Sequence, residues 1–256
     1  MYHLPPTDEP ASPSHPPAPP WLKRLREAIL NVVFPTRCVG CGKPHALLCD
    51  SCRRALDYLP ENICHSCGRA LRSGVTGQCA RCALLTPSLT GRFAVAYSTG
   101  ALRTAIHRLK YSDQSRLAEP LADMLAGWWR DNPLPTELLI PIPLHPRRER
   151  ERGYNQAALL ARRLGPAIGM PIDETLLTRI RNTRPQVGLG NAERQENVAG
   201  AFVCAEGVLA GRSVLLLDDV TTTGATLEAG AYALRAGGAR EVWGLTVARA
   251  ATRGES

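Results

Sequence analysis

The chain has 256 residues and a formal net charge of +8, from 31 lysines and arginines against 23 aspartates and glutamates. A chain of this length can hold one sizeable hydrophobic core with a small additional module. No run of residues approaches the ~20 apolar positions that a membrane-spanning helix requires, which excludes a helical membrane protein. The basic charge permits a nucleic-acid partner but does not require one.

The first 20 residues carry eight prolines and almost no apolar side chains, a composition that predicts a disordered tail. Residues 21–34 follow with an amphipathic pattern in which Leu22, Leu25 and Ile29 share one face. We expect a short helix that packs on the module after it, with binding to a membrane surface as the alternative. Residues 21–88 are assigned to this helix and a cysteine-rich module.

Eight of the nine cysteines form four C-x-x-C pairs. Two residues between cysteines let both thiolates face one metal ion, and four thiolates complete a closed structural zinc site. Pairing of nearest neighbours predicts two zinc ions, and an interleaved pairing is the alternative. The ligands of the first site are Cys38, Cys41, Cys49 and Cys52, and those of the second are Cys64, Cys67, Cys79 and Cys82.

Disulfide bonds are the competing interpretation of these cysteines. We favour zinc and a cytoplasmic location, because C-x-x-C is a metal or redox spacing in an intracellular chain and the sequence shows no signal peptide. The ninth cysteine, Cys204, is expected to be a small buried hydrophobic residue. Eight thiolates and two Zn²⁺ ions would lower the net charge to about +4.

Residues 89–252 alternate between strand and helix patterns, which predicts an α/β domain with a mainly parallel sheet flanked by helices. The expected strands are residues 93–97, 138–143, 214–217 and 242–247, and the expected helices are 102–111, 117–129, 155–164 and 226–235.

The most informative segment is 213–226, in which a buried apolar strand runs into two acids and then a threonine-rich turn. Free backbone N–H groups and the start of a helix both favour an anion, so the turn predicts a phosphate monoester site. Asp218 and Asp219 can accept hydrogen bonds from two ribose hydroxyls, directly or through a divalent cation. The turn consists of Thr221, Thr222, Thr223, Gly224, Ala225 and Thr226.

This segment resembles the 5-phosphoribosyl-1-pyrophosphate (PRPP) motif of type I phosphoribosyltransferases, in which apolar residues precede two acids and a T-T-G-x-T turn. It lacks the G-K-[ST] ending of a Walker-type loop, which argues against an ATP hydrolase. An ordinary strand-turn-helix is the alternative, but it explains neither the paired acids nor the threonines.

Further marked stretches lie at the ends of the expected elements. IHRLKY ends the helix over residues 102–111, PIPLHPRR leaves the strand over 138–143, RGYNQ opens the next helix, and RPQ and RQENV lie between elements. Together with an N-terminal double zinc ribbon, they occur in the order typical of the ComF family of competence-associated phosphoribosyltransferase-like proteins, which includes GntX-type members. The chain resembles this family over residues 22–250.

The resemblance implies a type I phosphoribosyltransferase-like fold that binds Mg²⁺ and PRPP, with the turn holding the 5-phosphate and the two acids facing the ribose. Arginine suits the pyrophosphate because it stays charged and meets phosphate oxygens two at a time. The implied catalytic residues are Asp218, Asp219, Arg147 and Arg148, and the implied contacts of a pyrophosphate loop or of a closing loop over 181–197 are His145, Arg152, Arg184, Gln186, Arg194 and Lys110.

Two functions follow from the resemblance. The first is Mg²⁺-dependent transfer of phosphoribose from PRPP to an acceptor that the sequence does not identify, in a protein linked to DNA uptake, natural competence and transformation. The second is binding of single-stranded DNA, or sensing of PRPP or a nucleotide, without transferase activity. A third interpretation treats the zinc module as a structural brace or as a docking site for a DNA-uptake helicase or other competence protein. Tyr58 is the only aromatic residue of that module, so little base stacking is available there. DNA binding by the module would therefore rest on its basic side chains and weaken steeply with salt.

Overall fold

The computed structural model describes residues 36–80, 82–112, 114–183, 193 and 197–250. The chain divides into two units, Met1–Thr36 and Arg37–Ser256, and the sheet, the helices and both cysteine tetrads belong to the second. The expected tail over residues 1–20 and the expected helix over residues 21–34 lie outside the described residues. No helix in the described part of the chain is long and apolar enough to cross a lipid bilayer.

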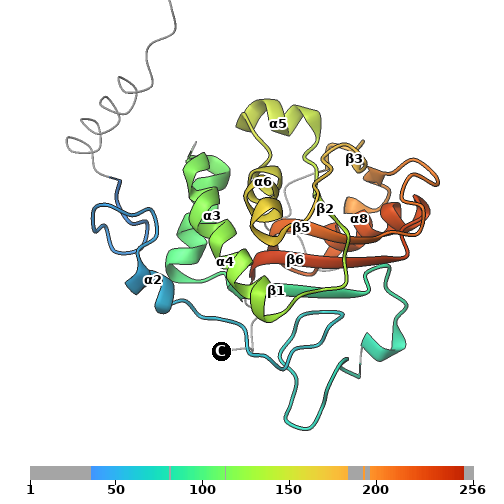
Figure 1. Cartoon of the computed structure of the whole chain (residues 1–256), viewed down its shortest axis with the longest axis horizontal. Helices are drawn as coiled ribbons and strands as arrows, with labels where there is room; N and C mark the ends of the chain where they lie inside the picture. Colours follow the sequence, from blue (N-terminus) through green and yellow to red (C-terminus); the bar gives the residue numbers. More distant parts are fainter. Residues whose placement is uncertain (1–35, 81, 113, 184–192, 194–196, 251–256) are drawn as a thin grey trace, which may run out of the picture. The chain divides into compact units, whose positions relative to one another are not determined.

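Four parallel strands form the central sheet, in the order β1 (Gly91–Tyr97), β6 (Glu241–Arg249), β5 (Ser213–Thr221) and β2 (Leu138–Pro141) (Figure 1). Strand β5 lies in the middle and is buried along almost its whole length, because side chains pack on both of its faces. This arrangement confirms the expected α/β class with a mainly parallel sheet.

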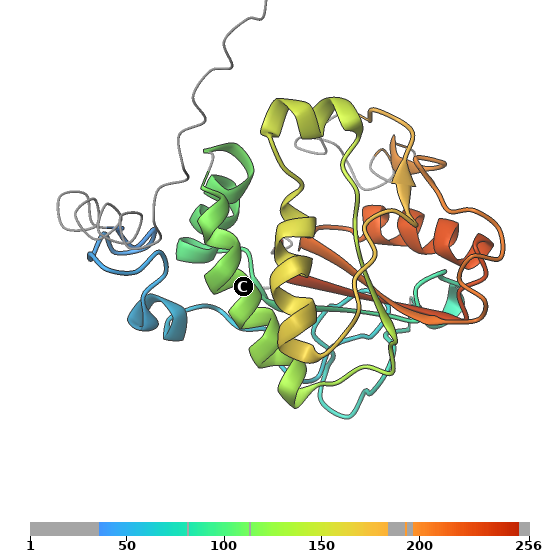
Figure 2. The same cartoon turned by 45° about the horizontal axis from the view of Figure 1, so that its top comes forward.

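Helices α4 (Ala118–Asp131) and α6 (Gln156–Ile168) cover one face of the sheet, and α3 (Gly100–Tyr111) joins the same hydrophobic core (Figure 2). A short 3₁₀ turn, η2 (Ser115–Leu117), leads into α4. Apolar residues at helical spacing, such as the fully buried Leu160 of α6, form the inner side of these helices.

The opposite face is covered by α8 (Ala225–Ala236) and by a small two-stranded antiparallel sheet of β3 (Thr178–Arg179) and β4 (Phe202–Val203). Adjacent residues of β5 alternate between the two cores, with Leu216 on the α8 side and Leu217 on the side of α4 and α6. The two acids that follow in β5 therefore start on opposite faces of the sheet.

Three short elements complete the described fold: α2 (Asp50–Arg54), η1 (Cys82–Leu84) and α5 (Pro146–Arg152). The strands and helices expected within residues 89–252 all correspond to observed elements, with bounds that differ by up to four residues. Neither α5 nor the β3–β4 sheet is predicted by the apolar pattern. Helix α5 consists of charged residues after Pro146, and it forms because His145 caps its start and Gly153 (φ 84°) ends it.

Irregular chain covers both edges of the sheet. At the β1 edge, Tyr58 forms an antiparallel bridge with Ala96. At the β2 edge, the N–H of Leu139 donates to the carbonyl of Pro171 at 2.9 Å, and Leu139 forms a parallel bridge with Ile172. The first of these covering segments is the link between the two cysteine tetrads.

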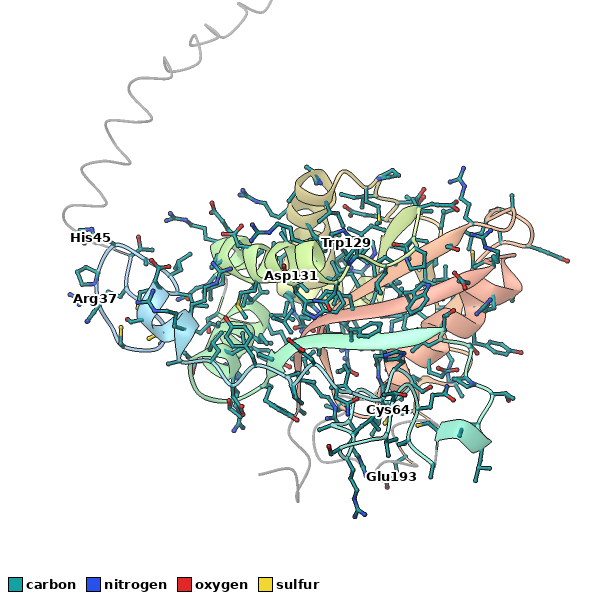
Figure 3. All side chains as sticks on the ribbon, turned by 60° about the horizontal axis from the view of Figure 1, so that its bottom comes forward. Arg37, His45, Cys64, Trp129, Asp131 and Glu193 are labelled. Atoms are coloured by element: carbon teal, nitrogen blue, oxygen red, sulfur yellow. The ribbon has the colours of Figure 1, made fainter. Side chains whose placement is uncertain are left out.

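The two tetrads contact different parts of the α/β domain. Val39 and Leu48 of the first belong to the hydrophobic core that contains α3, and His65 beside the second packs on the ring of Phe93 in β1. In Figure 3, Arg37 and His45 mark the first tetrad and lie well apart from Cys64 of the second. The expected domain boundaries at residues 88 and 89 remain a prediction.

Candidate functional site

The threonine-rich turn joins the end of β5 to the start of α8. Gly224 precedes the helix in a left-handed conformation (φ 85°), which glycine adopts without steric penalty. No described residue accepts a hydrogen bond from the backbone N–H of Thr222, Thr223 or Gly224. These N–H groups and the first turn of a 12-residue helix together offer a site for an anion.

The two acids at the end of β5 have different partners. Asp219 lies on the side of α3, where its Oδ2 is 2.8 Å from Nζ of Lys110. Asp218 lies on the other side, where it interacts electrostatically with Arg179 of β3. Only 8% of Asp218 and 1% of Asp219 is exposed. The pair therefore lies just before the turn, and the two carboxylates are close enough to interact with each other.

The charge around the acids is unbalanced. Burial, and then the neighbouring carboxylate of Asp219, raise the pKa of Asp218 from 3.8 to about 8. Burial alone would lower the pKa of Lys110, but the carboxylates of Asp219 and Asp218 outweigh it and raise that pKa. Lys110 and Arg179 together do not keep the pKa of Asp218 at its ordinary value, so an additional cation at this edge would favour the ionised form of both acids.

Helix α5 arranges the first two arginines that follow β2. Nδ1 of His145 accepts the N–H of Arg147 at 3.2 Å and so caps the helix. The side chain of Arg147 is exposed and its Nε is 3.0 Å from Oε1 of Glu151. Arg148 donates to the carbonyl of Thr183, which lies in the first part of the expected closing loop over 181–197. His145 and Arg148 are thus held in place, whereas Arg147 is tied only to a neighbour on its own helix.

Arg152, at the other end of α5, meets the end of α3. Its guanidinium lies 5.4 Å from the ring centroid of Tyr111 and also donates to Oε1 of Gln156. The ring of Tyr111, 63% exposed, lies 5.0 Å from that of His107. Because Tyr111 follows Lys110, which contacts Asp219, this exposed aromatic and cationic surface lies next to the acids.

Part of the expected site lies outside the described residues, namely Arg184, Gln186 and Arg194. Two surface hollows, of about 370 Å³ beside Val203 and Cys204 and about 190 Å³ between Gly40 and Thr99, contain neither the acids nor the turn. Cys204 is half-buried beside the first hollow, not fully buried as expected.

The cysteines form two tetrads, and in each the sulfur atoms lie within 4.8 Å of one another. The Sγ–Sγ distance is 3.5 Å for Cys41 and Cys49 and 4.0 Å for Cys67 and Cys79. A tetrahedral zinc ion with Zn–S bonds of about 2.3 Å requires about 3.8 Å. All nine cysteines are free of disulfides. The geometry fits zinc, confirms pairing of nearest neighbours, and excludes both the interleaved pairing and the disulfide interpretation.

The two tetrads repeat one pattern of hydrogen bonds. In the first, the N–H of Cys49 donates to Sγ of Cys38 at 3.4 Å, and in the second the N–H of Cys79 donates to Sγ of Cys64 at 3.3 Å. An N–H group directed at sulfur stabilises the thiolate that zinc requires. Both tetrads are therefore organised as structural zinc sites.

The sequence pattern does not single out Arg92, which the structure places beside the turn. This residue of β1 is only 6% exposed, and its guanidinium donates to the carbonyls of both Thr223 and Cys67. An arginine inside a strand of buried residues indicates that a polar partner exists, but the sequence does not show which one.

The chain is similar to known proteins over most of its length. It is 33% identical to Competence protein F of Haemophilus influenzae over 226 residues, which cover 83% of this chain and 97% of the relative. It is 33% identical to DNA utilization protein YhgH of Escherichia coli K12 over 224 residues, covering 83% and 97%. Competence protein ComFC of Bacillus subtilis is 27% identical over 201 residues, covering 75% and 79%.

A family model described as "Double zinc ribbon domain" matches residues 29–83, which include both tetrads. Among solved structures, the chain is similar to glutamine PRPP amidotransferase of Bacillus subtilis (TM-score 0.35, 22% identity, 50% of this chain and 25% of the other). It is also similar to adenine phosphoribosyltransferase of Trypanosoma brucei (TM-score 0.32, 12% identity, 54% and 66%). Both TM-scores are below 0.5, so the description of the fold rests on the strand topology.

Proposed function

Because the chain belongs to the ComF family of competence proteins, we propose that it binds PRPP or a nucleotide 5′-phosphate in a role linked to DNA uptake. The observation that carries this proposal is the turn after β5, where available N–H groups and the start of α8 directly follow two buried acids. Cysteine thiolates on zinc suit a reducing compartment, so we place this function in the cytoplasm.

In this proposal, the N–H groups of residues 222–224 bind the 5-phosphate, and Asp218 and Asp219 bind the ribose hydroxyls. The cations of α5, Arg147 and Arg148, bind the pyrophosphate together with Mg²⁺. The ion would neutralise pyrophosphate oxygens when bound. The raised pKa of Asp218 supports a cation at this edge, because such an ion would relieve the repulsion between the two carboxylates.

The same arrangement suits the charge changes of phosphoribosyl transfer. Breaking the bond between C1 of the ribose and the pyrophosphate leaves positive charge on the sugar ring and negative charge on the departing group. The carboxylates at the end of β5 would stabilise the positive charge on the sugar ring, and the arginines of α5 would stabilise the negative charge on the departing pyrophosphate. The proposal specifies the ligand and assigns no acceptor.

Calorimetric titration of the full chain with PRPP in the presence of Mg²⁺ tests the proposal. We expect saturable binding that Asp218→Asn weakens at least tenfold, because the ribose loses a charged partner. A Thr222→Ala, Thr223→Ala double variant should also bind more weakly, since the turn loses two hydroxyls. The matched control is Thr178→Ala, at an exposed threonine of β3, which should bind as the wild type does. Equal affinity in all four proteins would contradict the proposal.

A second candidate function, binding of single-stranded DNA, is favoured by the surface formed by Tyr111, His107 and Arg152. An exposed aromatic ring beside a guanidinium is a platform on which a base can stack. If this function holds, Tyr111→Ala should weaken oligonucleotide binding about tenfold, and the affinity should fall steeply with salt. Fluorescence anisotropy with a labelled oligonucleotide measures both effects, and an affinity that is independent of salt and of Tyr111 would exclude this candidate.

A further inference from the structure

Arg92 lies between the second cysteine tetrad and the turn after β5. Its Nη1 donates to the carbonyl of Thr223 at 2.8 Å, and its Nη2 donates to the carbonyl of Cys67 at 2.9 Å. Its backbone N–H donates to the carbonyl of His65 at 2.5 Å. One buried arginine therefore ties the knuckle of residues 64–67 to the turn.

The hydrogen bond to Thr223 fixes the orientation of a ligand-binding group. The carbonyl of Thr223 and the N–H of Gly224 belong to one peptide unit, which is planar and trans. In such a unit the C=O and N–H bonds point in opposite directions. While Arg92 holds the carbonyl on the side of the second tetrad, the N–H of Gly224 points to the other side.

The guanidinium also occupies the space against Gly224. A Cβ built on this glycine would lie 0.9 Å from Nη1 of Arg92, so no larger residue fits while the arginine is in place. Gly224 is therefore required both for its left-handed φ and for the close approach of Arg92.

A second connection runs from the second tetrad to α8. The carboxylate of Glu228, in the first turn of the helix, accepts the N–H groups of Ser88 and Leu89. Nε of Arg235, in the last turn, donates to the carbonyl of Ser88 at 3.1 Å. The segment that leaves the second tetrad therefore holds the helix whose N-terminus forms part of the phosphate site.

The charges around Arg92 point to the same tetrad. The negative groups that face its guanidinium are the sulfur atoms of Cys67 and Cys82 and the carboxylate of Glu228, and Arg249 is the facing positive group. Four thiolates with one Zn²⁺ carry a net charge of −2. The zinc-bound tetrad thus stabilises a buried cation whose own hydrogen bonds go to two backbone carbonyls.

We propose that the second zinc site positions the phosphate turn through Arg92, and that the first zinc site does not. Loss of zinc would release the knuckle of residues 64–67, and with it the carbonyl of Cys67 that holds one side of the guanidinium. Arg92 is a positioning residue, because it acts on the ligand only through the peptide between Thr223 and Gly224. The ligand named here rests on the proposed function, while the link between zinc and the turn does not.

The two tetrads supply a matched pair of variants, because Cys49 and Cys79 occupy equivalent positions. Each Cys→Ala change should leave one zinc per chain by metal analysis. We expect Cys79→Ala to weaken binding of PRPP at least tenfold and Cys49→Ala to change it less than about twofold. Equal losses of affinity in the two variants would overturn the inference.

The wild type gives a test that needs no variant. Linkage is reciprocal for equilibrium affinities, so saturating PRPP should protect one of the two zinc ions from removal, raising its affinity about tenfold in equilibrium competition with a chelator, and leave the other unchanged. In Arg92→Gln this protection should disappear, while in Arg54→Gln, at an exposed arginine beside the first tetrad, it should remain. Protection of both ions, or of neither, in a protein that binds PRPP would overturn the inference.

Arg92→Lys separates charge from geometry, because lysine keeps the charge but lacks the planar fork that reaches two carbonyls. We expect thermal denaturation to show that Arg92→Lys is folded. This variant should recover less than half of the protection of zinc that Arg92→Gln loses, and full recovery would show that the charge alone is enough to position the turn.

If the wild type binds no PRPP, the proposed function fails, and hydrogen exchange then tests the link between zinc and the turn separately. Faster exchange of residues 221–227 in Cys79→Ala than in Cys49→Ala would support it, and equal rates would overturn it.

Discussion

Each cysteine tetrad consists of two C-x-x-C pairs with the same type of N–H to sulfur hydrogen bond, but the two tetrads have different surroundings. The first packs against α3: Val39 lies in the core, and Gly40 approaches Ala101 so closely that an added Cβ would lie 2.8 Å from the alanine Cβ. The second faces the start of α8, where Arg92 connects it to Thr223. Two similar metal sites can therefore have different effects on the rest of the protein, because each stabilises only the elements that it contacts.

This comparison separates stability from ligand binding. Both tetrads are expected to stabilise the fold, since metal binding in such sites is coupled to folding. Only the second is expected to change the affinity of the phosphate turn.

The largest effect should come from removing both metal ions. Structural zinc contributes on the order of 10 kcal/mol of binding free energy per site at neutral pH, so the ribbons should lose their order without it. We expect the midpoint of thermal unfolding to fall by more than about 10 °C after chelation. Calorimetry before and after chelation measures this shift, with re-addition of zinc as the control. An unchanged midpoint in zinc-free protein would show that the ribbons add no stability.

A matched pair of glycine variants should separate the two regions next. Gly224→Ala forces a left-handed residue and collides with Arg92, so we expect a loss of about 2–3 kcal/mol in the free energy of unfolding and at least 100-fold weaker PRPP binding. Gly40→Ala crowds Ala101 and Cys52 beside the first tetrad, at an expected cost of about 1–2 kcal/mol. Urea unfolding and calorimetry measure both quantities. A large loss of PRPP affinity in Gly40→Ala would show that the first tetrad also affects ligand binding.

The buried carboxyl of Asp218 is expected to lower the free energy of unfolding, independently of either tetrad. Its pKa is raised from 3.8 to about 8, first by burial and then by Asp219. Between these values the folded protein holds a proton that the unfolded chain releases, so the free energy of unfolding should fall as pH rises from 4 to 8. Asp218→Asn should remove this fall and stabilise the protein by on the order of 2 kcal/mol at pH 7. Urea unfolding at pH 6 and pH 8.5 measures how much the free energy of unfolding falls with pH in each protein. An equal fall in the wild type and in Asp218→Asn would contradict this prediction.

The smallest effect on stability is expected at Arg147, far in sequence from both tetrads. Its exposed pair with Glu151 is worth at most about 0.5 kcal/mol, so Arg147→Ala should leave the unfolding midpoint nearly unchanged. If Arg147 binds pyrophosphate, the same change should weaken PRPP binding about tenfold and leave binding of ribose 5-phosphate unchanged. Parallel titrations with the two ligands measure this, and equal effects on both would remove Arg147 from the pyrophosphate site.

The parallel sheet and both metal sites could be predicted from the sequence because their signals are local. Short apolar runs alternate with helical patterns, and C-x-x-C spacing places two thiolates on one turn. The observed end of β5 differs from the expected one by four residues: the strand continues beyond Leu217, so both acids lie within it. Helix α5 was missed because residues 146–152 contain no apolar periodicity, and only the cap at His145 and Gly153 define it.

The arrangement of the candidate site depends on contacts between distant residues, which no local pattern contains. Arg92 and Thr223 are 131 residues apart, and Lys110 reaches Asp219 from another helix. A helix-terminal lysine is also a common partner of the helix dipole, so its contact with Asp219 is not evident from sequence. The ligand contacts expected of Arg184, Gln186 and Arg194 remain predictions, since these residues lie outside the described chain.

The covered edges of the sheet have a consequence for how other molecules can approach it. Segments around Tyr58 and Ile172 already form bridges with β1 and β2. A foreign strand therefore finds no open row of main-chain donors and acceptors at these bridges, which protects against edge-to-edge aggregation. A protein partner that binds at these bridges would have to recognise side chains, not extend the sheet.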